Sequence, residues 1–181
     1  TKLTRLESNT FEGCQRLMEL TLPQNVEEIG SCAFYNCTKL LSITLPEKLE
    51  TIGSEAFYGC EQLLEVYDLT PYIYVEKSDY YNGCVAYYAK AVFTSSAQSL
   101  ERIELDGFYF VKYNTTYYLH HYVGDMQDIL TIPETGYDIV ILANAFEGSN
   151  ASKTVISESV TVIYADTYNY SVLEDSYYKG N

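Results

Sequence analysis

Residues 34–56 read FYNCTKLLSITLPEKLETIGSEA, and this stretch is one full copy of a repeat that decides the fold. An earlier copy begins at Phe11 and a later one at Phe57, so the copies follow one another at a fixed 23-residue period. A fixed period of about 20 to 50 residues is typical of a solenoid, in which each repeat forms one turn and stacks on its neighbours. The repeat period alone therefore predicts a solenoid, without any use of the amino-acid composition.

Equivalent positions of the copies carry similar apolar side chains. The alternation Ile43-Thr44-Leu45 predicts a short strand with one buried face. The Ser-x-Ala-Phe pattern predicts one helical or 3₁₀ turn, with Ser31 and Ser54 as caps. Neighbouring turns should lie about 4.8 Å apart, so each position becomes a ladder, in which Ile29 and Ile52 should be fully buried. The repeated positions include Phe11, Phe34 and Phe57, Cys14, Cys37 and Cys60, Leu20, Ile43 and Val66, and Leu6, Ile29 and Ile52.

Residues 1–66 resemble the BspA-like class of leucine-rich repeats. The resemblance rests on three recurring patterns, Leu-x-x-Ile-x-Leu-Pro, Ile-Gly and Ala-Phe-x-x-Cys. The pattern returns in altered form at Leu130–Pro133 and at Ile141–Phe146. We expect from this pattern a right-handed α/β leucine-rich repeat solenoid with 23-residue turns, interrupted by a β-rich, tyrosine-rich insertion. The resemblance also implies a secreted or surface-displayed protein of host-associated microbes that adheres to host proteins or other cells. It implies no catalytic residues.

One continuous solenoid domain of three stretches is expected. Residues 1–66 should form regular leucine-rich repeats that start in mid-repeat, residues 67–128 a β-rich insertion or degenerate repeats, and residues 129–181 further leucine-rich repeats. Within the insertion, residues 107–124 predict a hairpin, because two segments rich in aromatic and β-branched residues flank a polar turn. Its adjacent histidines, His120 and His121, should point to opposite faces of a strand and so cannot chelate one metal ion.

Composition limits the classes of partner. The 181 residues include 25 acidic and 11 basic side chains, for a net charge of −14. This balance argues against nucleic acid and anionic lipid, since both require a basic surface. No run of about 18 apolar residues is present, so no membrane insertion is expected. Because the chain starts within a repeat, the strand around Leu20 should have an open edge, and we expect end-to-end self-association of this fragment.

The cysteine positions and the absence of known motifs argue against catalysis and metal binding. Cys14, Cys37 and Cys60 should be reduced, buried and inert, as small hydrophobic residues in one ladder. Cys32 differs because equivalent positions hold Asn9 and polar residues such as Glu55, so it should be exposed and reactive. The chain contains no known catalytic motif and no metal-ligand spacing, which predicts no enzyme, no cofactor and no metal site.

Two functions remain open. The first is adhesion or protein–protein interaction, in which a tyrosine-rich surface binds a protein or glycan ligand on host or other cells, because aromatic residues with a polar tip are enriched in recognition surfaces. The second is a structural spacer that projects another domain of a larger surface protein. A contiguous exposed aromatic patch would favour the first, and mostly buried tyrosines the second. The candidate ligand-binding residues are Tyr67, Tyr72, Tyr74, Tyr80, Tyr81, Tyr87 and Tyr88.

Overall fold

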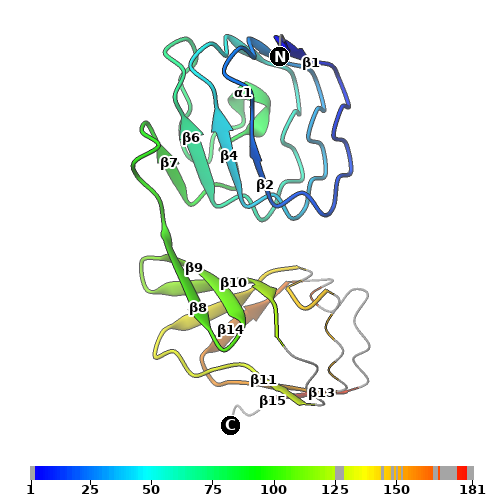
Figure 1. Ribbon diagram of the computed structural model, residues 1–181, viewed down its shortest axis with the longest axis vertical. Coiled ribbons are helices and arrows are strands. Elements are labelled where there is room, and N and C mark those ends of the chain that lie inside the picture. Colours follow the sequence, from blue (N-terminus) through cyan, green and yellow to red (C-terminus); the bar gives the residue numbers. More distant parts are fainter. Residues whose placement is uncertain are drawn as a thin grey trace. The chain divides into compact units, whose positions relative to one another are not determined.

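The structure is a computed structural model that describes residues 3–124, 129–143, 145–147, 149, 151, 153–164 and 167, and the backbone of residues 175–178. Residue contacts divide the chain into two compact units, Thr1–Ser99 and Leu100–Asn181, which we call unit 1 and unit 2 (Figure 1). Both units consist mainly of strands and turns, and the four-residue α1 is the one helix among the described residues. The predicted boundaries at residues 66 and 128 stay predictions.

Two parallel sheets run along unit 1, where successive turns lie side by side (Figure 1). The larger sheet has the order β2-β4-β6-β7 and the smaller one the order β1-β3-β5. Leu20 pairs with Ile43, and Ile43 with Val66, so the predicted 23-residue turn is confirmed. The strands are β1 (Arg5–Leu6), β2 (Glu19–Thr21), β3 (Glu28–Ile29), β4 (Ser42–Leu45), β5 (Thr51–Ile52), β6 (Glu65–Asp68) and β7 (Ala91–Phe93).

The tyrosine-rich stretch after β6 returns to the same sheet. Val66 in β6 pairs in parallel with Val92 in β7, just as Ile43 pairs with Val66 one turn earlier. The turn from β6 to β7 is longer than the turns before it, and it holds α1 (Tyr81–Cys84). This stretch therefore continues the stack of unit 1 as an enlarged turn.

Ladders of like side chains form the core of unit 1. Phe34 is fully buried between Phe11 and Phe57, with ring centroids 5.2 and 4.8 Å apart. Ile29 pairs with Ile52 in one ladder, as predicted, and Ile29 is fully buried. The prediction of full burial was wrong for Ile52, which is half-buried. The reason is that β5 is the edge strand of its sheet, and the short α1 packs beside it in place of another strand.

Tight turns replace the helical turn predicted for the Ser-x-Ala-Phe segment. The Tyr35 N–H donates to the carbonyl of Cys32, three residues earlier. Cys32 and Asn36 have φ values of 55° and 56°, a left-handed conformation that cannot continue a right-handed helix. The hydroxyls of Ser31 and Ser54 lie 3.4 Å apart and bond to each other across adjacent turns instead of capping helices.

Unit 2 begins with antiparallel strands and continues as parallel turns. β8 (Glu101–Leu105), β9 (Phe108–Tyr113) and β10 (Thr116–Tyr122) are antiparallel neighbours, which confirms the predicted hairpin. β10 then pairs in parallel with β12 (Asp138–Ile141), and β12 with β14 (Val160–Ile163). The second sheet is parallel and consists of β11 (Ile129–Thr131), β13 (Lys153–Ile156) and β15 (Asp175–Tyr178).

β10 is both a hairpin strand and a solenoid strand. Tyr117 pairs with Ile139 and Ile139 with Val160, at spacings slightly shorter than those of unit 1, so unit 2 nearly keeps the same period. Leu130 and Phe146, from the altered repeats predicted by the sequence, are buried in the core of unit 2. The right-handedness of the solenoid stays a prediction, as do the repeats in the part of 129–181 outside the described residues.

Candidate functional site

The seven tyrosines predicted as a ligand-binding surface fall into an exposed and a half-buried group. The exposed side chains, with their exposed fractions, are Tyr72 (62%), Tyr74 (76%), Tyr80 (61%) and Tyr81 (77%). The half-buried side chains are Tyr67, Tyr87 and Tyr88. Exposed tyrosines were expected for a binding module and buried tyrosines for a structural spacer. The stretch contains both kinds, so burial alone does not separate the two functions.

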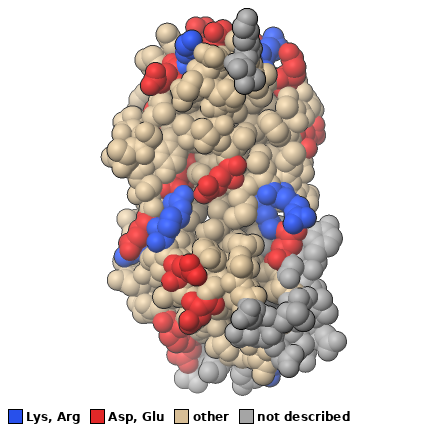
Figure 2. Space-filling model, in the orientation of Figure 1, with Lys and Arg blue, Asp and Glu red and all other residues tan. Residues whose placement is uncertain are grey.

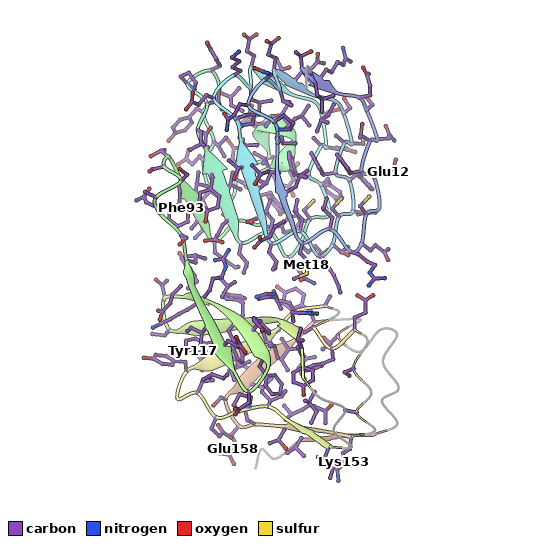
Figure 3. The ribbon with its side chains drawn as sticks, in the orientation of Figure 1. Glu12, Met18, Phe93, Tyr117, Lys153 and Glu158 are labelled. Atoms are coloured by element: carbon purple, nitrogen blue, oxygen red, sulfur yellow. The ribbon has the colours of Figure 1, made fainter. Side chains whose placement is uncertain are left out.

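Tyr67 lies apart from the other candidates, on β6. Its hydroxyl donates to the Glu65 carboxylate at 3.1 Å, and its ring lies 5.5 Å from that of Phe93 on β7. Figure 3 shows Phe93 on this last strand of the sheet. Tyr67 therefore helps to hold β6 against β7, and we do not include it in the candidate surface.

Tyr80, Tyr87 and Tyr88 are brought together around α1. The Tyr87 ring lies 4.1 Å from the Tyr80 ring and 4.8 Å, edge on, from the Tyr88 ring. Tyr80 immediately precedes α1, and the other two tyrosines follow it. The Asn82 side chain donates to the carbonyl of Tyr74 at 2.8 Å, which ties the segment before α1 to the same turn.

Two further tyrosines extend this group, and the sequence analysis missed them. Tyr35 and Tyr58 stack with ring centroids 5.6 Å apart and an interplanar angle of 21°. Tyr58 is 40% exposed, and it lies close enough to Tyr80 and Tyr88 to affect their pKa values. The 23-residue spacing of Tyr35 and Tyr58, each one residue after the buried phenylalanine, was the signal that could have found the pair. We define the tyrosine surface as Tyr35, Tyr58, Tyr80, Tyr81, Tyr87 and Tyr88, where Tyr81 is included because it is exposed and directly follows Tyr80 in the chain.

Left-handed backbone in α1 orients this surface. Asn82, Gly83 and Cys84 have φ values of 49°, 63° and 64° in succession. A Cβ on Gly83 would lie 2.5 Å from the Gly53 carbonyl oxygen, so only glycine fits this close approach to the preceding turn. The sharp reversal leaves Tyr81 exposed while Val85 is buried in the core.

The pKa values of two phenols in the tyrosine surface, those of Tyr80 and Tyr88, are raised. Hydrogen bonding to the Tyr87 side chain, followed by burial and by neighbouring tyrosines, raises the pKa of Tyr80 to about 12. Burial and the Glu61 carboxylate raise the pKa of Tyr88. Hydroxyls that stay protonated can both donate and accept hydrogen bonds, so the surface combines apolar ring area with polar tips.

Carboxylates lie beside the tyrosine surface. Asp79 directly precedes Tyr80 in the chain. Glu55 lies three residues before Tyr58, and its carbonyl accepts a hydrogen bond from the Tyr58 N–H at 3.2 Å. Burial, then Glu55 and Asp79, raise the pKa of Cys84 in α1. The Asp79 side chain also accepts a hydrogen bond from the Tyr81 N–H at 3.0 Å. On the face drawn in Figure 2, side chains of both charges occur, some of them side by side, with wide areas of uncharged residues between these groups. The site is therefore an aromatic surface with acidic neighbours.

A hollow of about 360 Å³ lies in unit 2 and is lined by Arg102, Ile103, Glu104, Tyr109, Phe110 and His120. His120 lies at a β-bulge between Leu119 and His121, and it lines this hollow. Burial lowers the pKa of His120 to about 4, and its Nδ1 has no hydrogen-bond partner in the described structure.

The cysteine ladder is buried at two of its three positions. Cys37 and Cys60 are fully buried, and their thiols donate to the carbonyls of Phe11 and Phe34 at 3.0 and 3.2 Å. The neighbouring Cys37 thiol and burial raise the pKa of Cys60 far above its ordinary value. The prediction of full burial was wrong for Cys14, which is half-exposed because only one neighbouring turn of the ladder covers it.

The prediction that Cys32 is exposed was wrong, because Cys32 is half-buried, as Cys14 is. Thiol labelling of the native protein should follow the order of burial among these cysteines. We expect Cys32 and Cys14 to react about 100-fold or more faster than Cys37 and Cys60, because a buried cysteine reacts only after local opening that costs several kcal/mol. Peptide mapping after a timed pulse of iodoacetamide measures the order, and the same pulse in denaturant is the control in which all thiols should react alike. Modification of Cys37 before Cys32 would contradict the burial described here.

Metal-binding and membrane-spanning features are absent from the described residues. In the part of the chain that the structure describes, no group of three or more His, Cys, Asp or Glu side chains is arranged to hold a metal ion. None of the helices found there has the length and apolar character needed to cross a membrane.

Comparison with known proteins supports the repeat assignment. The family model for the BspA type leucine rich repeat region matches residues 1–111 in six copies. Comparison with curated proteins finds no match. Among solved structures, a leucine rich cell surface protein from Faecalibacterium prausnitzii is 18% identical, with a TM-score of 0.37 over 96% of this chain and 64% of that chain.

Two further solved structures are similar at the same level. The pneumococcal vaccine antigen PcpA is 19% identical, with a TM-score of 0.39 over 96% of this chain and 42% of that chain. A leucine-rich repeat protein from Eubacterium ventriosum is 18% identical, with a TM-score of 0.36 over 97% of this chain and 57% of that chain. The chain thus spans less than two thirds of the length of each of these proteins.

Proposed function

Because the chain belongs to the BspA-type leucine-rich repeat family, whose model matches residues 1–111, we propose that it is a non-enzymatic binding module of a surface or secreted protein. In this proposal it mediates adhesion or protein–protein interaction with a ligand on a host or neighbouring cell, and it needs no cofactor. Surface labelling of intact cells with an antibody to the chain tests the location.

The observation that carries the proposal is the group of tyrosine rings around α1, three of which are exposed. Tyr80 and Tyr81 are 61% and 77% exposed, and Tyr58 is 40% exposed. Tyrosine is enriched in recognition surfaces because it combines a large apolar ring with a hydrogen-bonding hydroxyl and few rotatable bonds. Exposed aromatic groups of this kind mark interaction sites more often than isolated surface residues do.

The alternative function, a structural spacer, has its own support. The regular ladders of unit 1 and the half-buried Tyr67, Tyr87 and Tyr88 are what a spacer would contain. In that case the tyrosines stabilise the enlarged turn, and the chain has no ligand. The two functions differ in whether substitution of exposed tyrosines affects binding or only stability.

Substitution of Tyr80 and Tyr81 by serine should abolish most binding. A panel of extracellular-matrix proteins and glycans is screened against the full chain, and the affinity of each hit is measured for the double variant. We expect a loss of about tenfold or more, because aromatic residues at the centre of an interface carry much of its binding energy. The control is Tyr164→Ser, which removes a 36% exposed tyrosine from unit 2. A panel without hits, or a hit that binds the double variant and the control equally, would favour the spacer.

A further inference from the structure

A lysine of unit 2 lies against paired tyrosine rings. Tyr117 and Tyr137 stack with centroids 4.9 Å apart and planes 18° apart. The Lys112 ammonium lies 5.8 Å from the centroid of Tyr117 and 5.1 Å from that of Tyr137. Its Nζ is 3.1 Å from a carboxylate oxygen of Glu101. Figure 3 marks Tyr117 in this unit. An ammonium group in this protein thus lies beside two stacked phenols and one carboxylate.

The tyrosine surface of unit 1 contains the same components. Tyr35 and Tyr58 stack at 5.6 Å and 21°, close to the geometry of the pair that holds Lys112. Glu61 is exposed and lies three residues after Tyr58 in the chain, and its charge contributes to the raised pKa of Tyr88. A stacked pair of phenols and a carboxylate therefore occur together again.

The charge near this surface favours a cation. Glu55, Glu61 and Asp79 lie beside the tyrosines, and the segment around α1 adds Glu76 and Lys77, so negative charge predominates. The chain as a whole carries −14. The negative faces of aromatic rings attract cations as well, and each such contact at an exposed site changes affinity by about two- to fivefold.

We propose that the tyrosine surface binds a polypeptide partner through an arginine- or lysine-bearing segment, with the cationic side chains over the tyrosine rings and beside Glu55, Glu61 and Asp79. This inference rests on the proposed binding function and names the chemistry of its partner. Anionic partners are disfavoured, because the carboxylates would repel them. A neutral glycan could stack on the rings but would gain nothing from the net negative charge.

The test uses the full chain and three defined probes: a peptide of alternating arginine, lysine and glycine, its glutamate counterpart of equal length, and a neutral oligosaccharide. Isothermal titration calorimetry measures each affinity at low and at physiological ionic strength. The basic peptide should bind, and its affinity should fall as salt screens the carboxylates. The glutamate peptide and the oligosaccharide should bind at least tenfold more weakly.

Variants separate the ring from the charge. Tyr58→Leu removes an aromatic ring and should reduce the affinity about threefold. The control Tyr164→Leu removes a tyrosine of unit 2 that lies outside the tyrosine surface, and it should leave the affinity unchanged. The combination Glu55→Gln, Glu61→Gln and Asp79→Asn should reduce it about tenfold, and asparagine keeps an oxygen that can accept from the Tyr81 N–H. The control combination Glu47→Gln, Glu50→Gln and Glu158→Gln removes the same charge from exposed positions outside the tyrosine surface and should have less than a twofold effect.

The possible failures are distinguishable. If both charge combinations weaken the basic peptide equally, its attraction is to the net charge and the inference is overturned. If the oligosaccharide binds best and Tyr80→Ser with Tyr81→Ser abolishes that binding, the partner chemistry is wrong and the binding function stands. If no probe binds, the inference is overturned, and the screen of matrix proteins and glycans alone decides the binding function.

Discussion

Replacement of Phe34 by alanine is expected to lower the free energy of unfolding of unit 1 by about 3–5 kcal/mol. Phe34 is fully buried between the rings of Phe11 and Phe57. Alanine would leave a cavity at the centre of the ladder, and the hydrogen-bonded turns on both sides limit how far it can collapse. Urea denaturation followed by circular dichroism measures the change.

The matched control is Phe11→Ala, because Phe11 is half-buried and contacts only one ring of the ladder. We expect it to cost roughly half as much as Phe34→Ala, since less apolar area leaves water on folding. Equal losses for both substitutions would show that the ladder does not contribute through burial between neighbouring turns.

Substitution of Gly53 by alanine is expected to cost about 3 kcal/mol or more. A Cβ at this position would lie 2.4 Å from the backbone nitrogen of Ser31 and 2.7 Å from the carbonyl carbon of Gly30. Both atoms belong to the backbone of the preceding turn, and the Gly53 N–H donates to the Ile29 carbonyl at 2.7 Å. Neither turn can move without loss of such bonds, so the strain cannot be relieved by a side-chain rotation.

Gly13→Ala provides the comparison. A Cβ there has no neighbouring atom within 4 Å, and only the positive φ of 67° opposes the substitution. We expect a cost of about 1 kcal/mol from this left-handed backbone. Thermal unfolding of both variants ranks them, and a Gly13 variant as unstable as the Gly53 variant would refute the close packing of turns.

The hydrophobic period predicted much of the fold because a solenoid gives each position the same neighbour in the next turn. The pairing of Ile29 with Ile52 and the stack around Phe34 follow from the 23-residue spacing alone. The hairpin in unit 2 was predicted because its two strands and polar turn are contiguous in the sequence. The half-burial of Ile52 was not predictable, because it depends on α1 packing at the edge of β5.

The residues of the candidate site were less predictable from the sequence than the fold was, because they depend more on tertiary structure. The tyrosine-rich composition located the stretch, but Tyr67 packs on β7 while Tyr80 and Tyr81 face solvent. Tyr35 and Tyr58 lie outside the stretch in the sequence, and their rings meet only because successive turns stack.

The sequence by itself determined the ladder: a repeated turn too small to bury its own apolar face must stack, and the period then sets which residues meet. Only the tertiary structure decided which tyrosines form a surface. That choice depends on the enlarged turn between β6 and β7 and on three successive left-handed residues, Asn82, Gly83 and Cys84, within it. The repeat pattern does not predict this backbone reversal, because the reversal occurs only once among the described turns. Its conformation also depends on the close contact of Gly83 with the preceding turn at Gly53.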